Sequence, residues 1–182
     1  VEIKDGLLPD VDRDLVRPLQ NKLSSEFESI YLDTAVVSIR ELGGLGYVTM
    51  ASSKESKEEK FDRVLMSVGR RPNTDKIRLE NTKVQLDSNG FVKVDFKGQT
   101  SDPAILAIGD ISGEPMLAHK ASYEARIAID GLKGKKMTSS NTVIPAVVFT
   151  DPEIAWCGLT ESEAKMKNLD FQVAKFPWRA SG

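Results

Sequence analysis

Cysteine and histidine are almost missing from this chain. Its 182 residues include one cysteine, Cys157, and one histidine, His119. A single cysteine excludes a disulfide within the chain and a zinc site made of cysteines, and a single histidine excludes a metal site built from several histidines. The sequence therefore predicts no metal site. Cys157 lies in the apolar run 154–159, with no histidine or cationic residue near it in sequence, so we expect a buried and unreactive thiol.

A strong charge of either sign is missing as well. The chain carries 25 Lys and Arg residues against 27 Asp and Glu residues, and its formal net charge is −2. This near balance gives no electrostatic reason to expect nucleic acid binding, and no apolar run is long enough to span a membrane. With 40% hydrophobic and 29% charged residues, the composition is typical of a globular chain. We therefore expect neither nucleic acid nor a membrane among its partners.

The segment TSDPAILAIGD, residues 100–110, contains the most informative pattern of the sequence. Its short apolar run, 104–108, ends abruptly at Gly109 and Asp110, which is typical of a buried strand followed by a turn. Ligands of α/β folds bind beyond the carboxyl ends of strands. There Gly109 permits close approach of a ligand, and Asp110 can accept hydrogen bonds from its hydroxyl groups. A turn that only leads into the next helix explains these two residues equally well.

A helix is predicted directly after this turn, over residues 116–132, and Pro115 suits its start. The apolar residues of this segment repeat at helical spacing: Leu117, Ala121, Ala125, Ala128 and Ile129. The N-terminus of such a helix carries partial positive charge and free backbone donors. Strand, Gly-Asp turn and helix N-terminus together predict a site for an electron-rich ligand.

Several motifs, all in one order, resemble the flavoprotein disulfide reductases. They are DGLLPDVDRDLV (5–16), SVGRRPN (67–73), GDISGEPMLAHKA (109–121), IPAVVFTDPEIAWCGLTESEA (144–164) and FPWRASG (176–182). Within this family they are most similar to the branch that oxidises the dihydrolipoyl groups of 2-oxoacid dehydrogenase complexes. The resemblance implies an α/β fold with partial Rossmann-like domains for FAD and NAD, followed by the start of an α+β dimerisation domain.

The same family uses two Gly-rich fingerprints, a redox cysteine pair and a His-Glu acid/base pair, and none of these is present in the sequence. Gly44 and Gly46 begin a Gly-x-Gly pattern, but Thr49 occupies the third glycine position. We therefore expect an internal segment of a longer enzyme, without a catalytic residue of its own. In isolation it should be inactive and should bind neither FAD nor NAD tightly.

The resemblance divides the chain into three parts. Residues 1–73 correspond to the C-terminal half of an NAD-binding domain, 74–138 to an FAD-binding segment, and 139–182 to the start of the dimerisation domain. Within the first part, a helix is predicted over 12–27, beginning or bending near Pro18, with Leu15, Leu19, Leu23 and Phe27 on one face.

Short strands and turns account for most of the remaining pattern. We expect strands at 1–3, 30–32, 35–39, 47–50, 61–68 and 171–178, and also within 141–150 and 154–159. The charged segment SSKESKEEK, 52–60, is interpreted as a solvated linker between hairpin arms. DSNG, 87–90, predicts a turn, and Thr160 with Glu163 predicts a capping box at the start of a helix over 161–167.

The resemblance also assigns cofactor positions. Glu2 stands where a carboxylate binds the adenosine ribose of NAD and repels the extra phosphate of NADP, and Val36 stands at the adenine pocket. The residues whose backbone approaches NAD are Ser67, Val68, Gly69 and Arg70. Asp110 corresponds to the carboxylate that binds the ribitol chain of FAD. The residues that approach the flavin ring through backbone groups are Met116, Leu117, Ala118 and His119.

Simpler explanations of several of these residues remain open on the sequence alone. Glu2 can be a surface carboxylate, Val36 an ordinary strand residue, and Arg70 a solvated charge or a member of an ion pair. For His119 we favour a packing or hydrogen-bonding role over that of a base, because the base of the family lies beyond residue 182.

The function implied for the intact enzyme is oxidation of protein-bound dihydrolipoyl groups, with electron transfer through a redox disulfide and FAD to NAD. The implied partners are a second copy of the enzyme, lipoyl domains and the E2 core of a 2-oxoacid dehydrogenase complex. The implied compartment is the bacterial cytoplasm or the mitochondrial matrix. One alternative is a glutathione or mercuric reductase type of enzyme, since FTDPEIA (149–155) suits the latter nearly as well. Another is a non-catalytic binding or assembly module.

Overall fold

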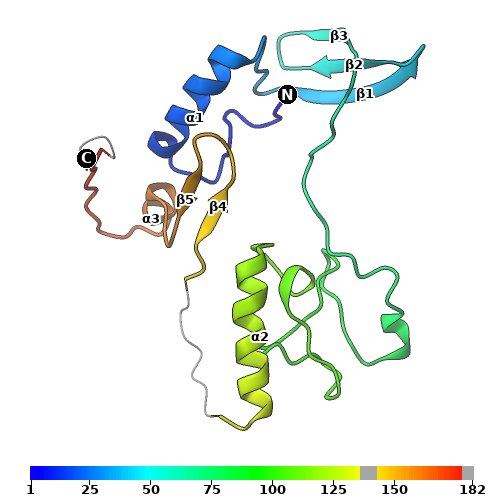
Figure 1. The fold of residues 1–182 in the computed structure, drawn as a ribbon, viewed down its shortest axis with the longest axis vertical. Coiled ribbons are helices and arrows are strands. Elements are labelled where there is room, and N and C mark those ends of the chain that lie inside the picture. Colours follow the sequence, from blue (N-terminus) through cyan, green and yellow to red (C-terminus); the bar gives the residue numbers. More distant parts are fainter. Residues whose placement is uncertain (136–142, 178–182) are drawn as a thin grey trace. The chain divides into compact units, whose positions relative to one another are not determined.

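The computed structural model describes residues 1–135 and 143–177, which fold as two compact units (Figure 1). The first unit comprises Val1–Leu65 and Val147–Gly182, and the second comprises Met66–Ala146. Helices and sheets both occur, as the sequence predicted. The predicted boundary at 138/139 and the end of the predicted strand 171–178 lie outside the described residues.

Helix α1, Arg13–Glu26, confirms the predicted helix, but it buries a different face. Val16 and Leu19 are almost fully buried, whereas Leu15 is 42% and Phe27 54% exposed. A strict four-residue repeat drifts around a helix of 3.6 residues per turn, by about 40° at each step. The stripe that stays on one side therefore follows mixed spacing, through Val16, Leu19 and the partly buried Leu23. The helix begins at Arg13, before Pro18, and continues through it.

The core of the first unit joins its two chain segments. Val11, Val16 and Leu19 pack with Ile154 of strand β5, Ile154–Trp156, which pairs with β4, Ala146–Val148. In Figure 1 the orange β5 accordingly lies beside the blue α1. The first and last thirds of the sequence thus share one hydrophobic cluster.

Polar contacts reinforce this union. Both carboxylate oxygens of Asp12, at the start of α1, accept hydrogen bonds from the backbone N–H of Glu161, at 3.0 and 3.2 Å. Lys175 pairs with Asp14 at 2.7 Å. Glu161 begins α3, Glu161–Met166, and the predicted capping box of Thr160 and Glu163 is confirmed there. The backbone N–H of Thr160 donates to Glu163 and holds the pKa of that carboxyl below its usual value.

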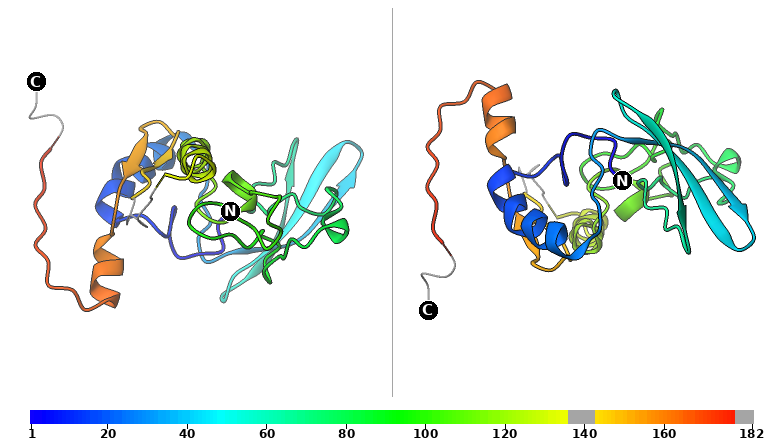
Figure 2. Two further views of the ribbon diagram at one scale, coloured as in Figure 1. Left: turned by 90° about the horizontal axis from the view of Figure 1, so that it is seen from below. Right: turned by 90° about the horizontal axis from the view of Figure 1, so that it is seen from above.

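Three antiparallel strands form the other part of the first unit, and Figure 2 shows them side by side. They are β1 (Ala35–Leu42), β2 (Leu45–Ala51) and β3 (Ser56–Phe61). The interpretation of 52–60 as a linker is wrong for β3, which is highly charged yet paired with β2 along its length. Two of its carboxylates have partners outside β3, since Glu58 pairs with Arg40 of β1 at 2.7 Å and Glu59 accepts from the Tyr31 hydroxyl.

Two apolar segments that were predicted as buried strands do not form strands. In 61–68 regular structure ends at Phe61, and Leu65 and Val68 are each 92% exposed. In 104–108 the backbone forms one isolated bridge, Gln99 with Leu106. A buried strand needs neighbouring strands to satisfy its backbone, and the described residues place none beside these segments. Residues 1–3, 30–32 and 171–177 likewise form no regular strand, so these predictions are wrong.

The second unit is organised around helix α2, Ala118–Leu132, which confirms the predicted helix. Two short 3₁₀ helices precede it, η1 (Leu79–Asn81) and η2 (Gly109–Ile111). The predicted turn at 87–90 is present, closed by a hydrogen bond from Asp87 N–H to the Phe91 carbonyl at 2.8 Å. Of the helices in residues 1–135 and 143–177, none has both the length and the apolar character needed to cross a membrane.

The buried face of α1 can be tested by comparing two leucines four residues apart. Leu19→Ala should lower the free energy of unfolding by about 2–5 kcal/mol, because it opens a cavity in the core shared with Ile154. Leu15→Ala, at an exposed position, should cost less than about 1 kcal/mol. Urea unfolding of the 182-residue chain measures both, and equal costs would contradict this assignment of the face.

Candidate functional site

The Gly109-Asp110 turn lies in η2, and its backbone requires glycine. Gly109 has φ +78°, a left-handed conformation that other residues adopt only with strain. A Cβ at this position would also meet the Cβ of Ala121 in α2 at 3.1 Å. The turn therefore lies directly against the helix at Gly109, which is buried, whereas Asp110 is exposed.

The side chain of Asp110 and the start of α2 offer complementary hydrogen-bonding groups. Within the described residues, Asp110 makes no side-chain hydrogen bond or ion pair, so its carboxylate is free to accept. Leu117 is the N-cap of α2, and no side chain caps the helix among the described residues. The amides of the first turn are therefore available as donors, and the helix dipole favours electron-rich groups there.

Lys120 and Glu124 bind the turn from α2, and the sequence interpretation did not identify them. Lys120 is 6% exposed and pairs with Glu124 at 2.8 Å. Its Nζ also lies 3.2 Å from the Gly109 carbonyl and 3.1 Å from that of Gly113. Glu124 Oε2 accepts from the Gly109 N–H at 2.7 Å and from the Ser112 hydroxyl at 3.2 Å. The sequence feature that could have identified them is the position of two charged residues among the alanines of the predicted apolar face.

Arg70 connects the segment 67–70 to the start of α2. Its Nη2 donates to the carbonyl of Met116 at 2.8 Å, so the structure brings two groups of predicted site residues together. Val68 is exposed, and Gly69 has φ +113° with no described atom within 4 Å of an added Cβ. Ser67 is exposed as well.

The single histidine and the single cysteine are both accessible. His119 is exposed, and its Nε2 lies 2.6 Å from the carbonyl oxygen of Pro145. This contact agrees with a hydrogen-bonding role for the ring. Cys157 follows β5 and is exposed, so the expectation of a buried thiol is wrong. The apolar run 154–159 extends past the end of β5 at Trp156, so Cys157 lies outside the strand.

Glu2 and Val36 lie in the first unit. The carboxylate of Glu2 accepts from the Lys4 N–H at 2.8 Å, and its backbone exchanges hydrogen bonds with Tyr31 and Thr34. Val36 lies in β1, next to a register irregularity, and is 45% exposed. Their proposed contacts with NAD stay predictions.

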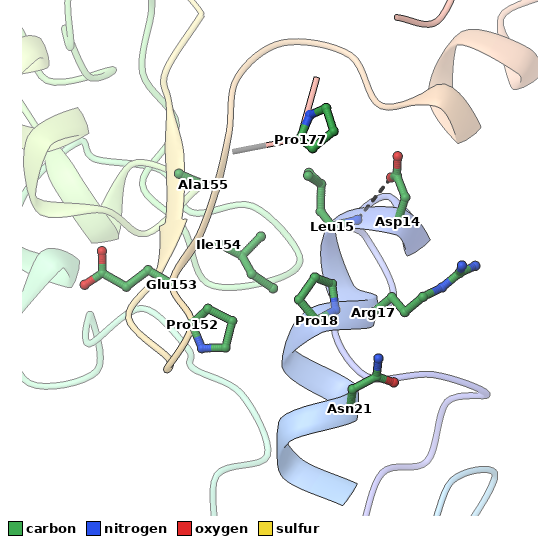
Figure 3. Close-up of a pocket in the computed structure, with 10 residues that line it drawn as sticks. All are labelled: Asp14, Leu15, Arg17, Pro18, Asn21, Pro152, Glu153, Ile154, Ala155 and Pro177. Carbon is green, nitrogen blue, oxygen red and sulfur yellow. Dashed lines mark hydrogen bonds between the residues drawn. The ribbon is translucent and has the colours of Figure 1, made fainter. Parts of the chain in front are cut away.

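A groove of about 840 Å³ in the first unit is lined by residues of α1 and β5, beside the core that these two elements share. In Figure 3, Ile154 points from the strand toward Leu15 and Pro18 of the helix. Asp14 and Arg17 also line it, but it contains no nucleophile paired with a base. In residues 1–135 and 143–177, no three His, Cys, Asp or Glu side chains are placed to hold a metal ion.

Comparison with family models matches most of the chain. Residues 1–125 match the model described as pyridine nucleotide-disulphide oxidoreductase, and residues 144–182 match the dimerisation domain of the same family.

Similar curated proteins are bacterial dihydrolipoyl dehydrogenases. The chain is 39% identical to the one from Vibrio cholerae over 100% of its own length and 38% of the relative's. It is 45% identical to the one from Geobacillus stearothermophilus over 74% of the chain and 29% of the relative. The chain thus spans about two fifths of the length of the first of these relatives.

Solved structures with similar folds include LpdA and the flavoprotein disulfide reductase RclA. LpdA from Mycobacterium tuberculosis is 28% identical, with a TM-score of 0.79 over 91% of this chain and 36% of that one. The HOCl-induced flavoprotein disulfide reductase RclA from Escherichia coli is 27% identical, with a TM-score of 0.82 over 98% of this chain and 40% of that one.

The contact between the turn and α2 predicts unequal costs for two Gly→Ala substitutions. Gly134 has φ +70°, and no described atom lies within 4 Å of an added Cβ, so Gly134→Ala should cost about 1–2 kcal/mol of backbone strain. Gly109→Ala should cost about 1 kcal/mol more, because Ala121 must move. Urea unfolding measures the difference. Ala121→Gly should reduce the extra cost, and a Gly109→Ala cost no larger than the Gly134→Ala cost would rule out the close contact.

Proposed function

Because this chain belongs to the pyridine nucleotide-disulphide oxidoreductase family, we propose that it is part of a longer flavoenzyme that oxidises protein-bound dihydrolipoyl groups and reduces NAD. The observation that carries the proposal is the segment 109–121. There a free carboxylate, Asp110, follows a turn that packs against the uncapped start of α2. The identity of 35–45% with dihydrolipoyl dehydrogenases supports this substrate class.

The donor and acceptor groups of the segment fit FAD. The Asp110 carboxylate suits the hydroxyl groups of the ribitol chain. The backbone at Met116, Leu117, Ala118 and His119 suits the polar edge of the flavin ring, where the helix dipole stabilises negative charge. When bound, FAD supplies a two-electron carrier between a dithiol and NAD. The residues of this chain bind and orient it.

The NAD site is proposed to use both segments that the resemblance identified. Glu2 accepts hydrogen bonds from the adenosine ribose, with Val36 against the adenine, and the backbone of Ser67, Val68, Gly69 and Arg70 lies along the nucleotide. The hydrogen bond from Arg70 to Met116 supports a route between this segment and the flavin end of α2. We retain the division into 1–73, 74–138 and 139–182 as a proposal.

Catalysis needs groups outside the present sequence. Disulfide exchange requires two cysteines, and the chain has one. The distal acid/base histidine is proposed to come from the rest of the enzyme, because His119 already binds the Pro145 carbonyl.

The proposed assembly is a homodimer, supported by the match of 144–182 to a dimerisation domain. Lipoyl domains and the E2 core of a 2-oxoacid dehydrogenase complex are the proposed partners, in the bacterial cytoplasm or the mitochondrial matrix. The bacterial origin of the similar dehydrogenases favours the first compartment.

A disulfide reductase with another substrate is the second candidate, and the fold similarity to RclA favours it. The discriminating experiment is an assay of the intact flavoprotein with dihydrolipoamide and NAD, beside glutathione disulfide or Hg²⁺ with NADPH. NAD reduction in the first assay alone supports the proposal. Turnover in the second alone supports the alternative. An intact protein inactive in both assays would favour a binding or assembly module.

The isolated 182-residue chain should be colourless and inactive. A charge-assisted hydrogen bond accepted by the Asp110 carboxylate contributes roughly 1.5–3 kcal/mol, whereas micromolar affinity needs about 8 kcal/mol. The phosphate-binding fingerprint that supplies the difference is not in the sequence. Absorption spectra, equilibrium dialysis with FAD and an assay with dihydrolipoamide and NAD check this. Stoichiometric FAD, or turnover by chain free of full-length enzyme, would contradict it.

The role of Glu2 predicts the nucleotide preference of the intact enzyme. Wild-type enzyme should prefer NAD over NADP, because the carboxylate repels the 2′-phosphate. Glu2→Ala should narrow the ratio of kcat/KM values for the two nucleotides by about tenfold or more, equivalent to about 1.4 kcal/mol. The exposed Glu28→Ala serves as the matched control and should leave the ratio unchanged. If the wild-type enzyme used both nucleotides equally, Glu2 would not discriminate against the 2′-phosphate of NADP.

A further inference from the structure

The ion pair between the buried Lys120 and the partly buried Glu124 is unfavourable for the stability of helix α2. Lys120 is in the first turn of α2, where the helix dipole disfavours a cation. The lysine also precedes the glutamate by four residues, which is the less favourable order for an i,i+4 pair. The Lys120 side chain is 8% and the Glu124 side chain 27% exposed, so desolvation costs the lysine ammonium group most. Helix stability alone therefore does not account for this pair.

The ammonium group of Lys120 has one close acceptor for each of its N–H groups. It has three N–H donors, and its three shortest contacts are Glu124 Oε1, the Gly113 carbonyl and the Gly109 carbonyl, at 2.8, 3.1 and 3.2 Å. Two of these are backbone atoms of the turn. The lysine therefore fixes both ends of the segment 109–113.

Glu124 completes the arrangement from the other side. Its Oε2 accepts from the Gly109 N–H at 2.7 Å and lies 3.2 Å from the Ser112 hydroxyl, which makes its shorter contact, 2.8 Å, with the Gly109 carbonyl. Gly109, directly before Asp110, is thus held at both its N–H and its carbonyl, and Gly113, three residues after Asp110, is held at its carbonyl. Only the side chain of Asp110 is left exposed.

The backbone of the turn needs such support. Both glycines have positive φ, +78° at Gly109 and +131° at Gly113, and glycine loses more conformational freedom on ordering than other residues. We propose that Lys120 and Glu124 are positioning residues, which hold Asp110 in the orientation that binds the hydroxyl groups of a ligand. The flavin part of this inference rests on the proposed function.

One experiment needs no ligand and uses the 182-residue chain. Glu124→Gln should increase the hydrogen-exchange rate of the Gly109 amide by at least about tenfold, because the charge-assisted acceptor is lost. Glu80→Gln, at an exposed glutamate of the same unit, is the matched control and should leave that rate unchanged. An unchanged rate in Glu124→Gln would overturn the inference.

A second experiment uses the intact flavoprotein and measures the rate of FAD dissociation. Lys120→Met and Asp110→Ala should each increase this rate by about tenfold, and the double variant by no more than the larger single effect, since both act through one contact. Lys133→Met, at an exposed lysine just after α2, is the control and should have no effect. Glu124→Gln replaces Lys120→Met if that variant does not fold.

The outcomes separate the two proposals. Multiplied effects in the double variant, or a Lys120→Met variant that loses thermal stability yet keeps the wild-type rate of FAD dissociation, would overturn the positioning role. A wild-type intact protein that holds no FAD would refute the proposed function instead. In that case the exchange rate of Gly109 still decides whether the pair fixes the turn.

Discussion

Hydrogen bonds between polar side chains and the backbone are the interaction on which the second unit depends. Its regular structure consists of α2 and two short 3₁₀ turns, so ladders of helices or sheets leave much of its backbone unpaired. Three aspartates supply the missing acceptors. Asp87 Oδ1 binds the amides of residues 89 and 91, Asp95 Oδ1 those of 97 and 99, and the Asp102 carboxylate those of 83 and 104. The last contacts, that with Ala104 above all, hold the pKa of Asp102 below its usual value. Lys120 and Glu124 extend the same principle to the turn that carries Asp110.

The first unit depends on contacts between segments far apart in sequence. Val16 and Leu19 pack with Ile154, Asp12 binds the amide of Glu161, and Lys22 binds Asp151. The segment matched by the dimerisation model therefore shares its core with the start of the chain. Each segment therefore provides packing surface for the other.

Helices were predictable from the sequence because their signals are local. The capping box at Thr160 and the periodic apolar residues of 116–132 are sufficient to identify α3 and α2. Strands were less predictable, because a strand depends on its neighbour. The apolar segment 104–108 has no strand beside it among the described residues, whereas the charged segment 56–61 pairs with β2.

The candidate site likewise has parts that local sequence predicts and parts that depend on distant contacts. The turn at Gly109 and the helix start after it could be predicted from their order in the sequence. The backbone partners of Lys120, Glu124 and Arg70 could not, because backbone atoms leave no trace in the residue types.

The exposed segment between the two units has a practical consequence for handling the chain. Val64 is 40%, Leu65 92%, Met66 69% and Val68 92% exposed, and the backbone there belongs to no strand of the described residues. Apolar, β-prone segments with unpaired backbone are templates for strand pairing between molecules. We therefore expect the isolated chain to self-associate through this segment as its concentration rises.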